Sequence, residues 1–398
     1  MTERRQGIPT RRATLALMGA AAVSACGVEP RIPYRPDDRA ATPLLGAPYR
    51  IRTDAAIEDY PPDLGPRFRE NGRSHYLAIS GGGANGAFGA GVLAGWTASG
   101  TRPTFSVISG VSTGALIAPL AFLGPEHDVT LLNLYTGGVA EGIGGKPSLL
   151  GLLTRGALVD PQPLRQLVEF FVSPSLLRGV AQEHARGRRL FVFTTDLDAQ
   201  LGVIWNMGAI AGSGDPGALS LFEDVLMASA AIPGAFPPIR IRGQTADGRT
   251  FEELHGDGAV VSNVFTLPET VLFSFQGQRA VGAALTDIHM LMNVNLEPEF
   301  NVVAVRPSAI TARSVSTLLK YQMLRQVNAT HDFAHAAGIG FHVTSIDMVA
   351  PDDVDTLEFN TAYMRALYAE GFRRARAGSA WSAALPPLEG GEAIVSAG

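Results

Sequence analysis

The chain has 398 residues, of which 46% are hydrophobic and 17% charged, and its formal net charge is −5. This composition supports a large buried core, excludes disorder over most of the chain, and offers no basic surface field for nucleic acid. The single cysteine, Cys26, excludes an internal disulfide and a thiolate metal cluster.

The first 25 residues have the pattern of a secretory signal peptide. Four arginines precede a short apolar stretch at 13–23, which is well below the ~20 residues of a membrane-spanning helix. The sequence VSAC at 23–26 resembles the lipobox of bacterial lipoproteins, in which the cysteine is acylated and becomes the new N-terminus. We therefore expect a signal over 1–25 and lipidation of Cys26. The protein is then exported, by the general or the twin-arginine route, and anchored in the bacterial cell envelope on the periplasmic side.

The rest of the chain divides by composition into three parts. Residues 26–70 are rich in proline, arginine and aspartate without a sustained period, which is typical of a tether or lead-in. Over 71–385, short apolar strands alternate with longer helical runs, and 386–398 is expected to be a flexible tail. We expect strands at 76–80, 105–109, 190–194, 203–206 and 289–295, and helices at 86–99, 113–123, 161–172, 314–336 and 361–376. This alternation predicts one α/β domain with a mainly parallel central sheet flanked by helices on both faces.

A glycine-rich turn follows the first predicted strand of this domain. The sequence GGGANG at 81–86 matches the dinucleotide fingerprint G-x-G-x-x-G, which requires an acidic residue about 20 residues later for the ribose. The chain has no aspartate or glutamate between Glu70 and Glu126, and no Gly-Lys-Ser/Thr follows the turn as in a nucleoside triphosphate loop. The turn is therefore not expected to bind a nucleotide cofactor.

A second turn has the pattern of a nucleophile elbow. The sequence GVSTG at 110–114 is G-x-S-x-G between a predicted strand and a predicted helix, with Gly110 and Gly114 allowing the tight backbone around Ser112. Both glycine-rich turns place free helix N-terminal amides at the same end of adjacent strands. We therefore expect the first turn to form an oxyanion hole for an acyl-transfer serine, because glycines let backbone N–H groups approach the negative oxygen.

The base that would activate Ser112 is harder to identify. None of the eight histidines lies in a sharp motif. His331 and His335 are four residues apart on a predicted helix, but no zincin pattern accompanies them, so structural roles are expected. The sequence HGDGAVVSN at 255–263 places Asp257 between two glycines after an extended stretch, although an Asp-Gly surface turn has the same pattern.

Together these motifs resemble those of the patatin-like phospholipase family. GGGANG, GVSTG and the Asp257-Gly258-Ala259 sequence occur in the family's order over about 75–300, and MASAAIPGAFPP at 227–238 resembles the segment that precedes its aspartate. The resemblance implies a lipid acyl hydrolase with a Ser–Asp dyad and no metal or organic cofactor. It assigns Ser112 as nucleophile and Asp257 as base. The oxyanion loop that it implies comprises Gly81, Gly82, Gly83 and Gly86.

One position departs from the family pattern. Many members carry arginine or lysine where this chain has Asn85, which affects the rate and headgroup preference rather than the reaction type. The expected substrate is a phospholipid or another acyl-ester lipid, with no nucleic-acid partner. Two alternatives remain: a non-lipid serine esterase or peptidase with a histidine base, and a membrane-anchored binding lipoprotein without catalysis.

Overall fold

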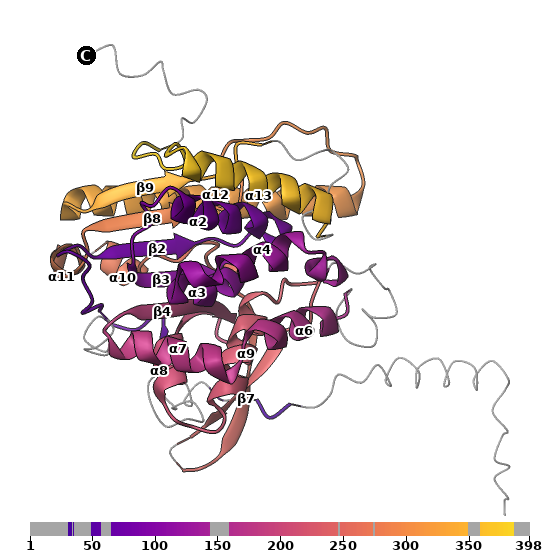
Figure 1. Cartoon of the computed structure of the whole chain (residues 1–398). Coiled ribbons are helices and arrows are strands. Elements are labelled where there is room, and N and C mark those ends of the chain that lie inside the picture. The colour runs from indigo at the N-terminus through magenta and orange to yellow at the C-terminus, as the bar shows by residue number, and fades with distance from the viewer. Residues whose placement is uncertain are drawn as a thin grey trace, which may run out of the picture.

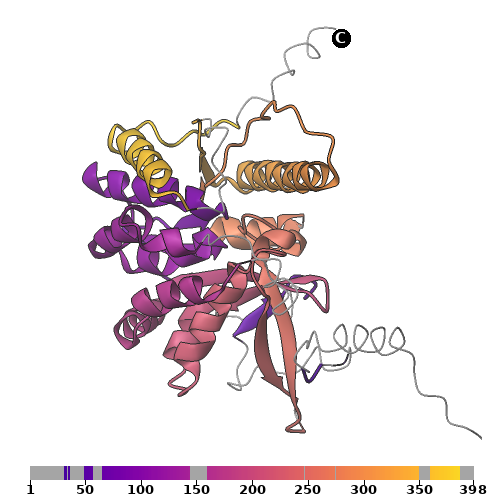
Figure 2. The same cartoon turned by 90° about the vertical axis from the view of Figure 1, so that its right-hand side faces the viewer.

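The computed structural model describes residues 31–33, 35, 49–56, 65–143, 159–245, 247–273, 275–348 and 359–385. Within these residues a nine-stranded sheet lies between two layers of helices (Figures 1 and 2). The predicted signal, the lipidation site Cys26 and the predicted tail lie outside the described residues.

The centre of the sheet is parallel, as the alternation of strands and helices predicts. The parallel strands, in spatial order, are β4 (Arg189–Asp196), β3 (Phe105–Val111), β2 (His75–Ile79), β8 (Asp287–Leu291) and β9 (Gly340–Thr344). β2 and β3 are direct neighbours, so the two glycine-rich turns that follow them lie at the same edge of the sheet. This arrangement confirms the juxtaposition expected from the sequence.

An antiparallel extension continues the sheet beyond β4. The sequence predicted its strand at 203–206 but not the antiparallel pairing or the other strands. β5 (Leu201–Asn206) pairs with β4, and β1 (Arg50–Arg52) pairs with β5. A hairpin of β6 (Ile239–Gln244) and β7 (Thr250–Asp257) pairs with β4 through its second strand. The segment expected to be a tether therefore contributes a strand to the sheet.

Helices cover both faces of the sheet, and each face has its own apolar core. One layer comprises α2 (Gly86–Ala98), α3 (Thr113–Leu123), α4 (Asp128–Thr136), α6 (Gln162–Phe171), α7 (Pro174–Ala185), α8 (Met207–Gly212), α9 (Ala218–Ser229) and α13 (Thr361–Arg376). The other comprises α10 (Glu269–Leu272), α11 (Phe275–Ala284) and α12 (Pro307–Ala337). Strand β2 contributes side chains to both apolar cores, because Leu77 and Ile79 point to the first core while Tyr76 and Ala78 point to the second.

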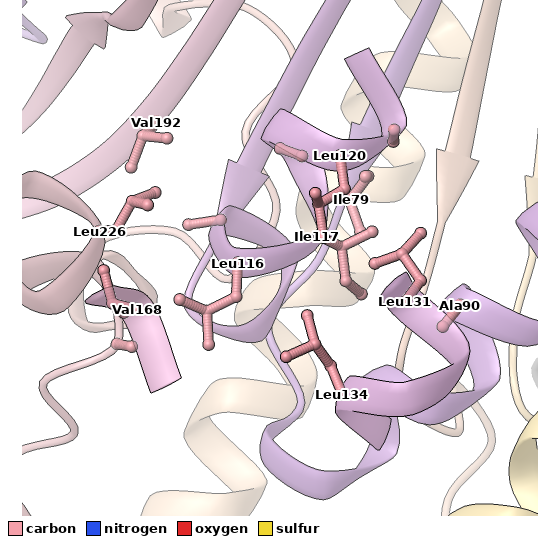
Figure 3. Packing of buried hydrophobic residues seen from close by; sticks show 14 of the residues in the cluster. Ile79, Ala90, Leu116, Ile117, Leu120, Leu131, Leu134, Val168, Val192 and Leu226 are labelled. Carbon is pink, nitrogen blue, oxygen red and sulfur yellow. The ribbon is translucent and has the colours of Figure 1, made fainter. Parts of the chain in front are cut away.

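The first core is packed by aliphatic side chains from several helices (Figure 3). Leu116, Ile117 and Leu120 of α3 lie between the sheet and Leu131 and Leu134 of α4. This packing holds the start of α3, and with it the turn that contains Ser112, against the sheet.

The glycines of α2 serve helix packing. A Cβ at Gly91 or Gly95 would clash with the backbone carbonyl of Tyr368 or Phe372 on α13. The two helices therefore approach closely, as adjacent helices do where small residues repeat every four positions. Within the described residues, no helix combines the length and the apolar character needed to cross a membrane.

Candidate active site

Ser112 lies in a strained turn between β3 and α3. Its backbone has φ 53° and ψ −123°, a conformation that residues other than glycine rarely adopt. A Cβ at Gly110 would clash with the Gly114 carbonyl, and one at Gly114 would clash with the carbonyl of Ile79. Only glycine fits at either position, and the turn has the backbone geometry of a nucleophile elbow.

Asp257 lies at the end of β7, directly beside Ser112. The Ser112 hydroxyl donates a 2.7 Å hydrogen bond to Asp257 Oδ2, and the Ala259 N–H donates a 2.8 Å bond to Oδ1. β7 pairs with β4, the neighbour of β3, and so brings together two residues 145 positions apart. Gly258 packs so closely on β4 that a Cβ there would clash with the Phe193 carbonyl.

The surroundings of Asp257 change its acidity. Its side chain is buried, and burial raises the pKa of this carboxyl group from 3.8 to about 7. The hydrogen bonds from the Ala259 N–H and the Ser112 hydroxyl oppose this rise without cancelling it. A carboxylate with a pKa near neutrality is a far stronger base than an exposed aspartate.

The segment at 227–238 supports both members of the pair. The Ser112 N–H donates to Ser229 Oγ at 3.0 Å, and the Ser229 hydroxyl donates to the Phe193 carbonyl at 2.7 Å. The Asp257 N–H donates to the Ala231 carbonyl at 3.0 Å. The sequence did not predict a role for Ser229, although the segment around this residue resembles a segment of the family.

The glycine-rich turn corrects part of the oxyanion prediction. The Gly81 N–H donates to the Asn263 carbonyl at 2.9 Å, and the Gly86 N–H donates to the Gly83 and Ala84 carbonyls. These two amides are therefore engaged, and both glycines instead permit close packing against side chains. The amides of Gly82 and Gly83, which line the same cavity as Ser112, remain as candidates for binding an oxyanion.

Asn293 holds this turn in place from the end of β8. Its backbone N–H donates to Ser80 Oγ at 2.8 Å, and its side-chain amide donates to the Ser80 carbonyl at 2.9 Å. A Cβ at Gly82 would clash with the Asn293 backbone carbonyl. Gly82 has φ 159° and Gly83 has φ 57°, so the turn uses backbone conformations that favour glycine.

A cavity of about 1490 Å³ opens above Ser112 and Asp257. Its walls are largely apolar, and the apolar residues that line it include Ile232, Phe265, Leu267, Val294, Leu319, Met323 and Ile346. Ligand pockets are usually apolar with a few converging polar groups, and this cavity has that character at larger size.

The sequence profile of the patatin-like phospholipase family matches residues 77–269, a span that includes Ser112, Asp257 and the glycine-rich turn. Residues 77–269 belong to the patatin-like phospholipase family. Membership indicates lipid acyl hydrolase activity in general.

Other comparisons add a structure but no curated relative. The crystal structure of VipD from Legionella pneumophila matches with a TM-score of 0.33 and 11% identity, over 79% of this chain and 70% of that chain. No curated protein matches the chain.

In the patatin-like domain, Asn85 has a partner that the sequence did not reveal. The Tyr363 hydroxyl of α13 donates to Asn85 Oδ1 at 3.0 Å, and both side chains line the cavity. Burial, together with the charge of Glu299, raises the pKa of the Tyr363 phenol, so it stays protonated and remains a donor. Asn85 therefore forms a neutral contact between the glycine-rich turn and α13.

Among the residues that the structure describes, no histidine lines the cavity above Ser112 and Asp257. His255, two residues before Asp257, is fully engaged elsewhere: Nδ1 lies 3.0 Å from Thr194 Oγ1 and Nε2 lies 3.1 Å from Glu253 Oε2. Glu253 in turn forms a buried ion pair with Arg50 of β1. His255 therefore belongs to an ion-pair network between β1 and β7.

The two histidines on α12 have ordinary surroundings. His331 Nδ1 lies 3.1 Å from the exposed carboxylate of Asp332. Within the described part of the chain, no cluster of three or more histidine, cysteine or acidic side chains has the geometry to hold a metal ion.

Proposed function

We propose that the protein cleaves fatty acyl esters of phospholipids, as a phospholipase A-type serine hydrolase with a Ser112–Asp257 dyad. The observation that carries the proposal is the 2.7 Å hydrogen bond from the Ser112 hydroxyl to Asp257 Oδ2, in a cavity whose described lining residues include no histidine. Ionised Asp257 takes the hydroxyl proton as Ser112 Oγ attacks the ester carbonyl carbon.

The reaction then follows from the groups around the dyad. The carbonyl oxygen becomes an oxyanion, which the amides of Gly82 and Gly83 stabilise together with the N-terminus of α3. Collapse of this intermediate expels the lysophospholipid alkoxide, which takes the proton from Asp257 and leaves an acyl group on Ser112. Asp257 next deprotonates a water molecule that attacks the acyl-serine. This second step releases the fatty acid and restores the hydroxyl.

The cavity supports a lipid as the substrate. Its apolar walls suit acyl chains, and its volume of about 1490 Å³ exceeds the ~300–1,000 Å³ of ordinary small-molecule pockets. The neutral Asn85 gives the glycine-rich turn no fixed cation for a phosphate, whereas Lys320 and Arg325 of α12 also line the cavity.

The test is hydrolysis of mixed phospholipid vesicles by the purified full chain, with the released fatty acids identified by mass spectrometry. Ser112→Ala should abolish both hydrolysis and labelling by a fluorophosphonate. Ser106→Ala is the matched control and should retain both, because Ser106 is a buried serine on β3, the strand that leads to Ser112, and its hydroxyl has no hydrogen-bond partner in the structure. Labelling of Ser112→Ala would contradict the proposed nucleophile, and wild-type activity confined to soluble esters would favour the non-lipid esterase.

We also infer that the protein is exported and anchored through lipid on Cys26. The support is the sequence alone: the only cysteine follows a signal-like segment at the lipobox position. A multiply acylated cysteine holds a protein firmly on a membrane, whereas one acyl chain binds marginally. Cys26→Ser should release the protein into the soluble fraction or leave its signal uncleaved. An intact mass showing an unmodified N-terminus upstream of Cys26 would contradict the anchor.

A further inference from the structure

An exposed apolar surface borders the mouth of the cavity. It is formed by the loop before α12 and the first half of that helix, and we call it the 300–321 surface. Its large apolar side chains and their exposed fractions are Phe300 (94%), Val305 (94%), Val302 (81%), Leu318 (70%), Tyr321 (56%), Val315 (49%) and Ile310 (48%). Exposed apolar side chains concentrated in one segment in this way mark an interaction site in a folded protein.

Helix α12 packs on the domain only through its second half. Met323, Leu324, Val327 and Phe333 are buried in the core on that face of the sheet, whereas the residues before 322 are exposed or half-buried. Figure 2 shows α12 and the preceding loop in orange, projecting at the edge of the molecule. On the projecting half, Ile310, Leu318 and Tyr321 share one helical face by their spacing.

The 300–321 surface is continuous with the catalytic cavity. Val315, Leu319 and Met323 of the same helix line the cavity that contains Ser112 and Asp257. The first half of α12 therefore forms part of the cavity wall and part of the exposed apolar surface, since Leu318 and Tyr321 belong to both. A ligand that contacts this surface lies at the rim of the cavity.

The charge of this region differs from that of the whole chain. Between Glu299 and Asp332 there is no carboxylate but four cations, in a chain whose net charge is −5. Arg313 and Lys320 are partly engaged, since they donate to the Glu299 and Glu297 carbonyls and Lys320 Nζ lies 3.8 Å from Glu299 Oε1. Arg306 and Arg325 are exposed. Exposed apolar side chains interspersed with arginine and lysine are typical of surfaces that bind anionic lipid.

We propose that the 300–321 surface docks on an anionic lipid bilayer, with its apolar side chains at the headgroup–acyl boundary and its arginines near lipid phosphates. The proposal rests on the proposed function for its purpose: the cavity mouth then faces the bilayer, and a phospholipid reaches Ser112 without crossing water. A second copy of the chain fits less well, because self-association would bring cations against cations.

The direct test reports contact at one position, independently of any anchor at the N-terminus. Because Cys26 is the only cysteine, Cys26→Ser allows a single label at Val302→Cys, with Val129→Cys on α4 (66% exposed) as the matched control. An environment-sensitive fluorophore at position 302 should shift to the blue with vesicles of equal phosphatidylglycerol and phosphatidylcholine. The shift should be much smaller with phosphatidylcholine alone and absent at position 129. Equal responses at both positions, or none at 302, would overturn the proposal.

A second test connects the surface to hydrolysis. The triple variant Phe300→Ser, Val302→Ser and Val305→Ser changes residues that do not line the cavity. It should lower hydrolysis of the anionic vesicles about tenfold or more, because vesicle binding scales with the apolar area buried. Hydrolysis of a soluble short-chain ester should stay within about twofold, as should both activities of the control Phe170→Ser on α6 (70% exposed).

The outcomes separate the two proposals. If the wild type hydrolyses no ester but the blue shift at position 302 is still present, the proposed hydrolase activity is contradicted and membrane docking by the 300–321 surface is supported. If the triple variant hydrolyses vesicles at the wild-type rate, membrane docking by the 300–321 surface is overturned and the proposed hydrolase activity is unaffected. A blue shift that grows with protein concentration without lipid would identify a second copy as the occupant.

Discussion

Replacing Asp257 by asparagine should stabilise the protein while it abolishes most of the activity. Asparagine keeps an oxygen that accepts from the Ala259 N–H, and its amide can donate to Ser112 Oγ, so both hydrogen bonds of the wild type have a counterpart. The variant removes the charge that burial penalises. Activity should fall by about 10²–10⁴, the range attributed to general-base catalysis.

The size of the stability gain follows from the pKa of Asp257. Burial raises it from 3.8 to about 7, so between these values the folded chain keeps a proton that the unfolded chain releases. The free energy of unfolding of the wild type therefore falls as the pH rises from about 4 to about 7, and this contribution is constant above pH 7. A shift of about three pKa units corresponds to about 4 kcal/mol as an upper figure, of which roughly 2–3 kcal/mol develop between pH 5 and pH 8.

The measurement is urea unfolding of the wild type and Asp257→Asn at pH 5, 6, 7 and 8. All other titrating groups are common to both proteins, so the difference between their free energies of unfolding isolates Asp257. This difference should grow in favour of the variant up to about pH 7 and then level off. A difference that is the same at pH 5 and pH 8 would refute the reasoning, because Asp257 would then have an ordinary pKa.

Three further substitutions test the support around the dyad. Ser229→Ala removes the acceptor for the Ser112 amide and should lower kcat on a short-chain ester about tenfold without changing the fold, because small misplacements of a nucleophile are costly. An unchanged kcat would show that the turn around Ser112 keeps its conformation without this hydrogen bond. Gly82→Ala places a methyl group against the Asn293 carbonyl and should lower kcat more than it raises KM, and an equal effect on both would argue against an oxyanion role. Arg50→Ala breaks a buried ion pair with Glu253 and should cost about 3–5 kcal/mol in thermal or urea unfolding, whereas a loss below 1 kcal/mol would mean that β1 contributes little.

The sequence predicted the site best where a functional turn also requires unusual backbone angles. Both glycine-rich turns were recognised, because a strand-to-helix turn that uses unusual backbone angles restricts the residue types within the turn itself. The predicted bounds of α13 agree with the structure, and Thr361 begins a clearly periodic segment. In contrast, α12 begins seven residues earlier than predicted, because its projecting half has no buried face to impose a period.

The sequence indicates an extended stretch before Asp257 but not the hairpin of β6 and β7, for a physical reason. Along β7 the buried side chains include Glu253, His255 and Asp257, so the strand lacks the apolar alternation of a half-buried strand. These polar groups are buried because partners distant in the sequence satisfy them, among them Arg50 of β1. The strand β1 within the expected lead-in segment carries no apolar period either, because its Arg50 and Arg52 pair with the buried Glu253.

The supporting residues of the site carry no local signal. Ser229 meets the Ser112 amide across 117 residues, and Asn293 meets Ser80 across 213 residues. Single polar residues near strand or helix ends are common, and only the assembled sheet shows which of them meet. For the same reason the sequence could not tell which glycine amides are engaged: Gly81 is bonded to Asn263, far along the chain.

The most direct test of the dyad is the rate of fluorophosphonate labelling of Ser112 as a function of pH, in the wild type and in Asp257→Asn. This rate reports activation of the serine without requiring a lipid. In the wild type it should rise with pH and level off above about 7, where Asp257 is ionised. In Asp257→Asn it should be about 10²–10⁴ lower and should lack this rise. Labelling of Asp257→Asn at the wild-type rate, with the same pH dependence, would contradict the assignment of Asp257 as the base.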